Sequence, residues 1–451
     1  MKTEKKPYIA TRNPCKLCAP LGASLVFQGI SGALTFLHGS QGCSTYIRRY
    51  FINHFREPLD IAASNFSEET AIFGGRDNLL TGLKNVCKQY GPKLIGVATT
   101  CLSETIGDDV PAILREFHLK QPSDFVPKIV YVSTPSYAGT HIDGFHAAVG
   151  AVVSTLASKR DRLRQIGIFP GLVSPADIRY LKEVMSDFGL DSVILPDYSE
   201  TLDGGMWTEY QKIQRGGTSL REIASLGGSL GIIEFGHSLK EKETAGTFLK
   251  ERFSVERFSL ELPVGIRLTD LFFELLEKLS GRKTQDKYRL RRSRLVDSYV
   301  DGHKYMFEKK AVVYGDEDMV ASIASFLLEI GVIPVLCATG AHSGTFEPVL
   351  NEIASRYGRE ITVCEGLDFE EISEKCKGLN IDFMVGGSKG YYIARKMSVP
   401  LVRIGFPIHD RIGAQRILHL GYEGTQQLFD RIVNAIIEKE QGASPVGYSY
   451  M

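Results

Sequence analysis

The sequence predicts an α/β protein that contains three doubly wound units of parallel sheet. Short apolar runs rich in β-branched residues recur along the 451 residues, each followed by a small polar segment and then by a helical pattern. Continuous apolar runs are typical of strands buried on both faces, as in parallel sheets covered by helices. Ten such runs are more than one sheet usually holds, so we expect three sheets.

The ten expected strands leave room for a helix between most neighbours. In chain order they read "KLIGVATT" (93–100), "KIVYVST" (128–134), "IGIFPG" (166–171), "SVILPD" (192–197), "LGIIEFG" (230–236), "AVVYGD" (311–316), "IPVLCATG" (333–340), "ITVCEG" (361–366), "DFMVGGS" (382–388) and "PLVRIGFP" (400–407). We expect domain boundaries near residues 165 and 305. They divide the chain into an N-terminal unit over 1–165, a second over 166–305 and a third over 306–451.

The most charged stretch of the chain spans residues 276–310, at the second of these boundaries. A stretch of this kind is able to form a nucleic-acid contact. Its interspersed acids and spaced apolar residues instead favour a solvated helix that links two units.

Composition argues against several classes of partner. Lys+Arg 53 balances Asp+Glu 53, so the sequence indicates neither a nucleic-acid footprint nor binding to an anionic membrane. No run of about 18 apolar residues occurs, so we expect no membrane span. Residues 1–13 are polar and basic with no apolar stretch behind them, which is not a secretory signal and favours a cytoplasmic location.

The small polar tips after the strands carry no nucleotide fingerprint. Ligands of doubly wound sheets gather outside the carboxyl ends of strands, so these tips are where a site is expected. No G-x-G-x-x-G follows a strand, and no G-x-x-x-x-G-K-[ST] loop occurs. We therefore expect no ATP binding by this chain alone.

Eight cysteines are too few for a disulfide scaffold, so they are core thiols or metal ligands. Four of them lie inside strand or helix patterns and are expected to be packed in the core: Cys87, Cys337, Cys364 and Cys376. Three others lie in loops or at expected helix starts: Cys18, Cys43 and Cys101. Backbone N–H groups at such positions lower the pKa of a thiol and can donate to the sulfides of a cluster.

Burial explains these three cysteines as well as metal ligation does, on spacing alone. Cys15 and Cys18 form a C-x-x-C pair, but it follows a polar arm rather than a strand, which argues against a thioredoxin-type dithiol. Zinc would call for a second such pair. Three separated thiols without a histidine pair fit an iron–sulfur site that another chain completes. Ser136 follows the next strand and is either a turn residue or a hydroxyl that faces the cluster.

Several segments together resemble the β-type subunits of the nitrogenase component 1 family. They span residues 12 to about 425 in the order of the family, and each is modest alone. As they stand here they read "NPCKLCAPLGA", "HGSQGCSTYIRRYFINHFREP", "NFSEETAIFGG", "TTCLSETIGDD", "STPSYAGTHIDGF", "LDGG" with "RGGTSLREI", and "RIGFPIHDRIGAQR".

This resemblance implies three Rossmann-like domains and a heterotetramer with two copies of a homologous α-type chain. It implies that Cys18, Cys43 and Cys101 hold a cluster of the 4Fe-4S type or of the eight-iron P-cluster type, shared with the partner. Ser136 would approach the cluster when it is oxidised, and an ATP-dependent iron protein would donate electrons. Cys15 matches no usual ligand. The later cysteines do not match the motif with which α-type chains hold the substrate-reducing cofactor, so this chain is not expected to hold that cofactor.

Three roles within the family are compatible with these motifs. The segment "GFPIHDRIGAQRILHLGYEGT" (405–425) and the short N-terminal arm favour a NifN-like scaffold chain for assembly of the iron–molybdenum cofactor in nitrogen fixation. The three retained cysteines and "NFSEETAIFGG" favour a catalytic β subunit. A reductase of another substrate, such as methylthio-alkanes, is the third. We expect the scaffold role, with the catalytic subunit as the alternative.

Overall fold

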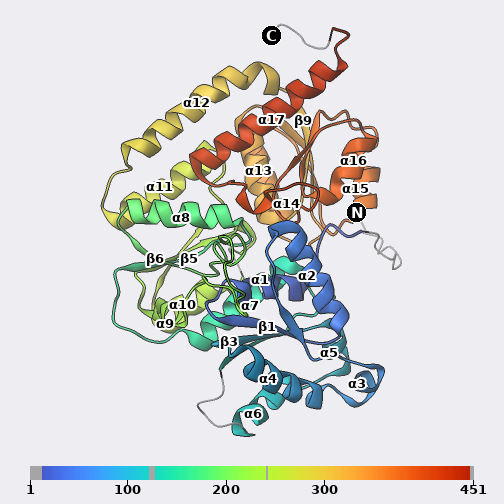
Figure 1. The fold of residues 1–451 in the computed structure, drawn as a ribbon. Coiled ribbons are helices and arrows are strands. Elements are labelled where there is room, and N and C mark those ends of the chain that lie inside the picture. The colour runs from blue at the N-terminus through green and yellow to red at the C-terminus, as the bar shows by residue number, and fades with distance from the viewer. Residues whose placement is uncertain (1–12, 121–126, 240–241, 447–451) are drawn as a thin grey trace.

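The computed structural model of the chain describes residues 13–120, 127–239 and 242–446. It contains three sheets whose strands all run parallel to their neighbours, with helices packed around them (Figure 1). Each of the ten apolar runs contains a strand, so the predicted α/β fold with three parallel sheets is confirmed. Residues 1–12, on which the expectation about a secretory signal rests, lie outside the described residues.

The first sheet has the strand order β2-β1-β3-β4. The chain order reverses between β1 and β3, which lie side by side, and this reversal opens a crevice at their carboxyl ends. The elements of this part are α1 (Ala19–Gln28), β1 (Ala33–His38), α2 (Gln41–Phe55), β2 (Ile61–Ala63), α3 (Glu68–Phe73), α4 (Arg76–Tyr90), β3 (Leu94–Thr99), α5 (Cys101–Ile106), α6 (Val110–Lys120), β4 (Lys128–Val132) and α7 (His141–Leu156).

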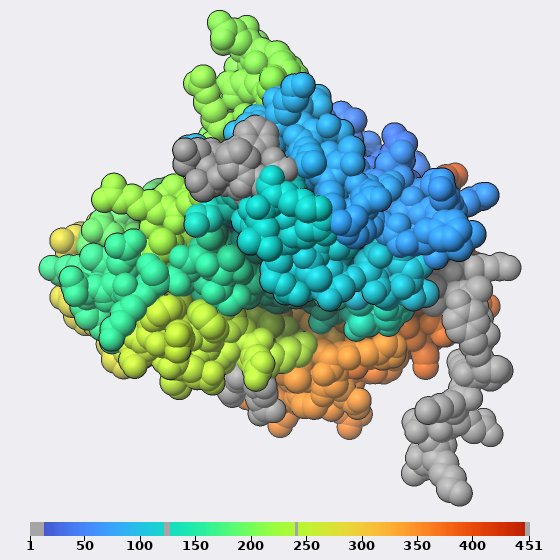
Figure 2. Space-filling view, turned by 90° about the horizontal axis from the view of Figure 1, so that it is seen from below, coloured from blue at the N-terminus to red at the C-terminus, as the bar shows by residue number. Residues whose placement is uncertain are grey.

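The second sheet repeats this topology with the order β6-β5-β7-β8. The segment between β6 and α9 projects from the surface as a green lobe in Figure 2, where Met206 and Tyr210 are strongly exposed. The elements are β5 (Gln165–Phe169), α8 (Pro175–Asp187), β6 (Asp191–Ile194), α9 (Leu220–Ser225), the 3-10 helix η2 (Leu226–Gly228), β7 (Gly231–Phe235), η3 (His237–Leu239), α10 (Ala245–Phe253), β8 (Glu256–Leu260), α11 (Ile266–Ser280) and α12 (Asp286–Met306).

The third sheet has five strands in the order β11-β10-β9-β12-β13. The final helix, α17, runs back along α12 (Figure 1). The elements are β9 (Lys310–Tyr314), α13 (Glu317–Glu329), β10 (Ile333–Ala338), α14 (Phe346–Arg356), β11 (Thr362–Cys364), α15 (Phe369–Cys376), β12 (Phe383–Gly386), η4 (Ser388–Gly390), α16 (Tyr391–Lys396), β13 (Leu401–Arg403), η5 (Ala414–Arg416) and α17 (Gly421–Ala443).

Three strands were not among the ten expected ones: β1, β2 and β8. β8 reads "ERFSL", and its residues are exposed or half-buried, as expected of an edge strand that lacks a continuous apolar run. The charged stretch 276–310 is mostly helical, but it forms the end of α11 and all of α12 rather than one helix. Gly281 caps α11 with a φ of +70°, a conformation that glycine adopts without strain.

Helices α1 and α7 cross at very short range because each helix has a glycine that faces the backbone of the other. A Cβ added at Gly22 would lie 1.7 Å from the carbonyl oxygen of His141, and one added at Gly144 would lie 2.0 Å from that of Ala19. The Leu17 N–H also donates to the His141 Nδ1 at 3.3 Å. This crossing fixes the start of α1, and with it Cys18, against the segment that follows β4. None of the helices in the described ranges is long and apolar enough to cross a membrane.

Candidate metal centre

Three of the cysteines lie at the carboxyl end of the first sheet, by the crevice between β1 and β3. Cys43 is the third residue of α2, just after β1, and Cys101 is the first residue of α5, directly after β3. Cys18 is the N-cap residue of α1. The strands place two of these thiols at neighbouring tips, because His38 at the end of β1 is paired with Thr99 at the end of β3.

The structure brings these three thiols and Ser136 together. Burial raises the pKa of Cys18 to about 12, and the neighbouring sulfurs of Cys43 and Cys101 add to this rise. The Ser136 N–H donates to the Cys101 Sγ at 3.3 Å, while its hydroxyl accepts from the Ala19 N–H at 3.2 Å. Ser136 therefore lies between the first residue of α5 and the first residue of α1.

The cysteine group opens onto the surface of the chain. Cys101 is exposed, and Cys18 and Cys43 are half-buried. Three exposed apolar residues lie within three positions of Cys43, Cys101 or Ser136 in the sequence, namely Tyr46, Leu102 and Tyr137. On the side that faces solvent, the described residues therefore leave room for ligands from another chain.

The chemistry of the donors suits a sulfur-rich cluster better than a single ion. Within the described residues, no group of three or more His, Cys, Asp or Glu side chains is arranged to hold one metal ion. Thiols bind metal as thiolates, so metal binding at such a site releases their protons. Cys18, Cys43 and Cys101 could each provide one sulfur to a larger cluster, and their role as ligands stays a prediction.

A buried histidine network supports the tips of β1 and β3 beneath these cysteines. The His38 carbonyl accepts hydrogen bonds from the Thr100 N–H at 3.1 Å and the Ser103 hydroxyl at 2.7 Å, which ties α5 to β1. The His38 ring lies 3.0 Å from Asp108 and 3.1 Å from the Ser64 hydroxyl. Burial lowers the pKa of His38 against the opposing effect of Asp108. Sequence reasoning missed this network, although "LTFLHGS" places a histidine at the end of a strand.

Cys15 lies in a different environment from Cys18. Its N–H donates to the Leu367 carbonyl at 3.3 Å, and Pro14 forms a β-bridge with Asp368. Cys15 packs in the hydrophobic core around the third sheet, and burial raises its pKa to about 12. The C-x-x-C spacing thus spans two sites, one in this core and one at the crevice of the first sheet. Of the four cysteines expected in the core, three are buried (Cys87, Cys337 and Cys376) and Cys364 is half-buried at the end of β11.

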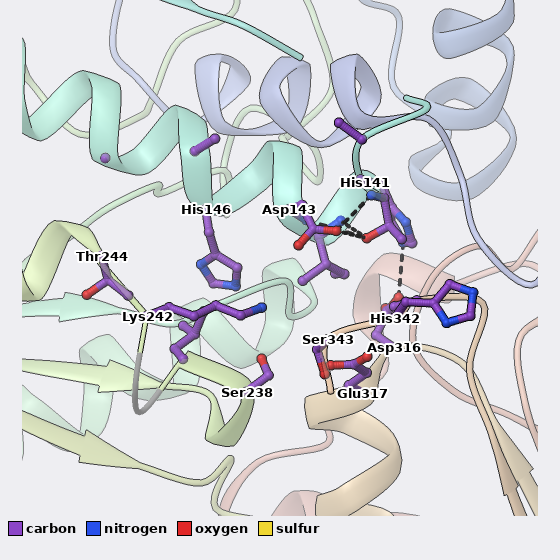
Figure 3. Close-up of a pocket in the computed structure, with 18 of the residues that line it drawn as sticks. His141, Asp143, His146, Ser238, Lys242, Thr244, Asp316, Glu317, His342 and Ser343 are labelled. Atoms are coloured by element: carbon purple, nitrogen blue, oxygen red, sulfur yellow. Dashed lines mark hydrogen bonds and ion pairs between the residues drawn. The ribbon is translucent and has the colours of Figure 1, made fainter. Parts of the chain in front are cut away.

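A cavity of about 810 Å³ lies where the strand tips of the three sheets meet. Its walls come from the start of α7, residues 238–239 and 242–244, and the segments that follow β9 and β10 (Figure 3). No prediction from the sequence anticipated it, because its walls are far apart in the chain. The polar tips that line it were visible in "STPSYAGTH" and in the segment after "AVVYGD".

Comparisons with known proteins agree in pointing to one group. The family model described as "Nitrogenase component 1 type Oxidoreductase" matches residues 18–437. A nitrogenase molybdenum-iron protein beta chain of Methanococcus maripaludis is 35% identical over 447 residues, covering 96% of each chain. A nitrogenase vanadium-iron protein beta chain of Trichormus variabilis is 33% identical over 447 residues, covering 97% of this chain and 96% of the relative.

Solved structures show the same similarity. A chain of "Nitrogenase Cp1 at pH 6.5" superposes with a TM-score of 0.94 at 31% identity, covering 100% of this chain and 98% of the other. A chain of "Nitrogenase Cp1 at pH 5" superposes with a TM-score of 0.70 at 13% identity, covering 99% of this chain and 95% of the other. The second likeness concerns the fold alone.

Proposed function

This chain belongs to the nitrogenase component 1 family as a β-chain-type member, and from that premise we propose that it is the electron-relaying β subunit of a nitrogenase. In this role it contributes Cys18, Cys43 and Cys101 to an iron–sulfur cluster that a homologous α-type chain completes. The observation that carries the proposal is the convergence of three thiols from separate segments at an open edge of the first sheet.

The residues of this chain are suited to such a half-site. The cluster, when bound, supplies a group that takes up and releases electrons without a change of the protein fold. Cys43 lies in the first turn of the 15-residue helix α2, where the N-terminal backbone N–H groups would favour a negatively charged cluster nearby. The Ser136 N–H stabilises the Cys101 sulfur through a charge-assisted hydrogen bond once that sulfur is deprotonated.

An electron donor would dock close to the cluster edge. Helix α3 packs against α5, the helix that begins at Cys101. α3 ends in Ile72 and Phe73, whose exposed fractions are 75% and 82%. Exposed apolar side chains that lie next to each other form the kind of patch that marks contact surfaces. We assign this surface to the ATP-dependent iron protein that the family resemblance implies.

Loss of iron tests the cluster assignment. Cys43→Ala and Cys101→Ala, each coexpressed with the α-type partner and purified without oxygen, should lose cluster iron and the absorption near about 400 nm. Cys15→Ala should keep both, because Cys15 lies in the core around the third sheet. Cys87→Ala is a matched control for loss of a buried thiol. Wild-type iron in every variant, or equal loss in the Cys15 variant, would overturn the assignment.

The scaffold role is a second candidate, favoured by the segment 405–425. The relatives named above are beta chains of molybdenum-iron and vanadium-iron proteins, which supports the catalytic role. Acetylene reduction separates the two. The purified complex, supplied with iron protein and ATP, reduces acetylene at a robust rate if it is catalytic. A complex that holds the cluster but reduces no acetylene would support the scaffold role instead.

A further inference from the structure

The cavity between the three sheets has the position and size of a small-molecule site. Parallel sheets present ligand sites at the carboxyl ends of their strands, and the tips of β7, β9 and β10 all reach this cavity (Figure 3). Its volume of about 810 Å³ lies within the usual range for ligand pockets. The cysteine site uses the crevice of the first sheet, so this cavity is free for a separate role.

One side of the cavity holds a buried carboxylate with one oxygen to which no described residue donates. Glu317, the first residue of α13, is only 7% exposed, and its Oε1 has no hydrogen-bond partner in the described part of the chain. Burial raises the pKa of Glu317 to about 7, although the Ser343 hydroxyl opposes this rise. The neighbouring Asp316 already pairs with the His141 Nε2 at 3.1 Å. Glu317 is therefore the acceptor that this side offers to a ligand.

The opposite side holds a cation with no acceptor among the described residues. Lys242 lines the cavity, and its ammonium makes no hydrogen bond or ion pair with any described residue. Figure 3 shows the Lys242 side chain between the labelled His146 and Ser238, on the far side of the cavity from His342. A ligand that carries an anionic group would find its partner here.

These two sides define the chemistry of the occupant. We propose that the cavity binds a small zwitterion of amino-acid size, whose ammonium donates to Glu317 and whose carboxylate pairs with Lys242. A polyanion fits poorly, because Asp143, Glu243 and Asp316 also line the walls. A single metal ion is disfavoured by the absence of any suitable ligand group within the described residues. The occupancy is independent of the cluster proposed above.

Calorimetric titration of the purified heterotetramer tests this proposal. The probes are glycine, β-alanine, 4-aminobutyrate and 6-aminohexanoate, which separate the two charges by increasing lengths. Butylamine and butyrate serve as probes with one charge each. We expect one chain length to bind best, with a Kd of about 1 mM or tighter, and both singly charged probes to bind at least about tenfold more weakly.

Two variants connect binding to the named side chains. Glu317→Gln and Lys242→Met should each weaken the best probe by about tenfold or more, whereas Glu256→Gln and Lys250→Met, at exposed positions, should bind it as the wild type does. The proposal fails if no probe saturates below about 20 mM, if butylamine binds as tightly as the zwitterion, or if either cavity variant keeps wild-type affinity. Iron content, measured on the same samples, reports the cluster separately.

Discussion

Glu317 makes the stability of the chain depend on pH in a predictable direction. Its pKa rises from 4.5 to about 7 on folding, so the folded state binds the proton more tightly than the unfolded state. The contribution of this group to stability is fully present below about pH 4.5 and is lost as the pH rises through about 7. Above that pH the folded protein carries a buried carboxylate with an oxygen that no described residue satisfies.

Glu317→Gln should therefore stabilise the protein at alkaline pH and not at acidic pH. We expect the free energy of unfolding to rise by up to about 3 kcal/mol near about pH 8, and to change little near about pH 4.5. Guanidinium unfolding at both pH values, without added ligand, measures the difference. Glu256→Gln, at an exposed position, is the matched control. An equal shift at both pH values would show that loss of charge is not the cause.

At the scale of single residues, the sequence predicted the position of a site residue where that residue closely follows an expected strand or begins an expected helix. Cys101 could be placed because it comes right after an apolar run, and Cys43 because it lies near an expected helix start. The separation of Cys15 from Cys18 could not be predicted, because the Cys15 N–H donates to Leu367 and the preceding Pro14 bridges to Asp368, both far along the chain. Glu317 escaped notice for the same reason, since the cavity that it lines is formed by segments from all three sheets.

At the scale of elements, the crossing of α1 and α7 connects packing to the cysteine site. Gly144→Ala would push a methyl group against the Ala19 carbonyl oxygen, from which an added Cβ lies only 2.0 Å. The two helices must then separate, at a cost of about 1–3 kcal/mol or more. Because Ala19 follows Cys18, the same shift should reduce cluster iron.

Gly150→Ala in the same helix is the control for this prediction. No atom lies within 4 Å of a Cβ added there, so this variant should gain about 0.5–1 kcal/mol from the better helix propensity of alanine. Thermal melting and iron analysis of both variants measure the two effects. A Gly144 variant that melts and binds iron as the wild type does would contradict this role for the crossing.

The sequence predicted ten of the thirteen strands in the described residues, at the edges of the sheets as well as at their centres. These ten were found because parallel strands covered by helices carry apolar residues on both faces. β1 was missed although it is a central, fully buried strand, whereas the missed β8 is an edge strand whose residues are exposed or half-buried. The division of residues 276–310 into two helices was missed as well, since the break at Gly281 lies in a stretch whose charges hide the periodicity.

At the scale of the whole molecule, three sheets could be predicted but not how they meet. The number of sheets followed from counting apolar runs, whereas the central cavity depends on contacts between segments hundreds of residues apart. The division into units over 1–165, 166–305 and 306–451 stays a prediction. Residue 165 is the first residue of β5, and residue 305 lies inside α12.

The surface at the end of α3 is where the molecule would meet its electron donor. Ile72 and Phe73 leave most of their apolar area in water, although they lie on a helix that packs against the one that starts at Cys101. A partner that covers them would lie next to α5, the helix that begins at Cys101. Such an interface would derive much of its affinity from a few large apolar side chains.

Phe73→Ser should weaken binding of the electron donor without lowering the stability or the iron content of the chain. We expect the donor concentration that gives half-maximal electron transfer to rise by about tenfold, which corresponds to about 1.4 kcal/mol of lost docking energy. Iron content and melting temperature should not change, because the side chain is 82% exposed. Leu119→Ser is the matched control, since Leu119 is 87% exposed on α6, and it should leave the donor dependence as it is. Equal effects of the two substitutions would mean that exposed apolar area in general, and not the surface beside Cys101, determines how the donor binds.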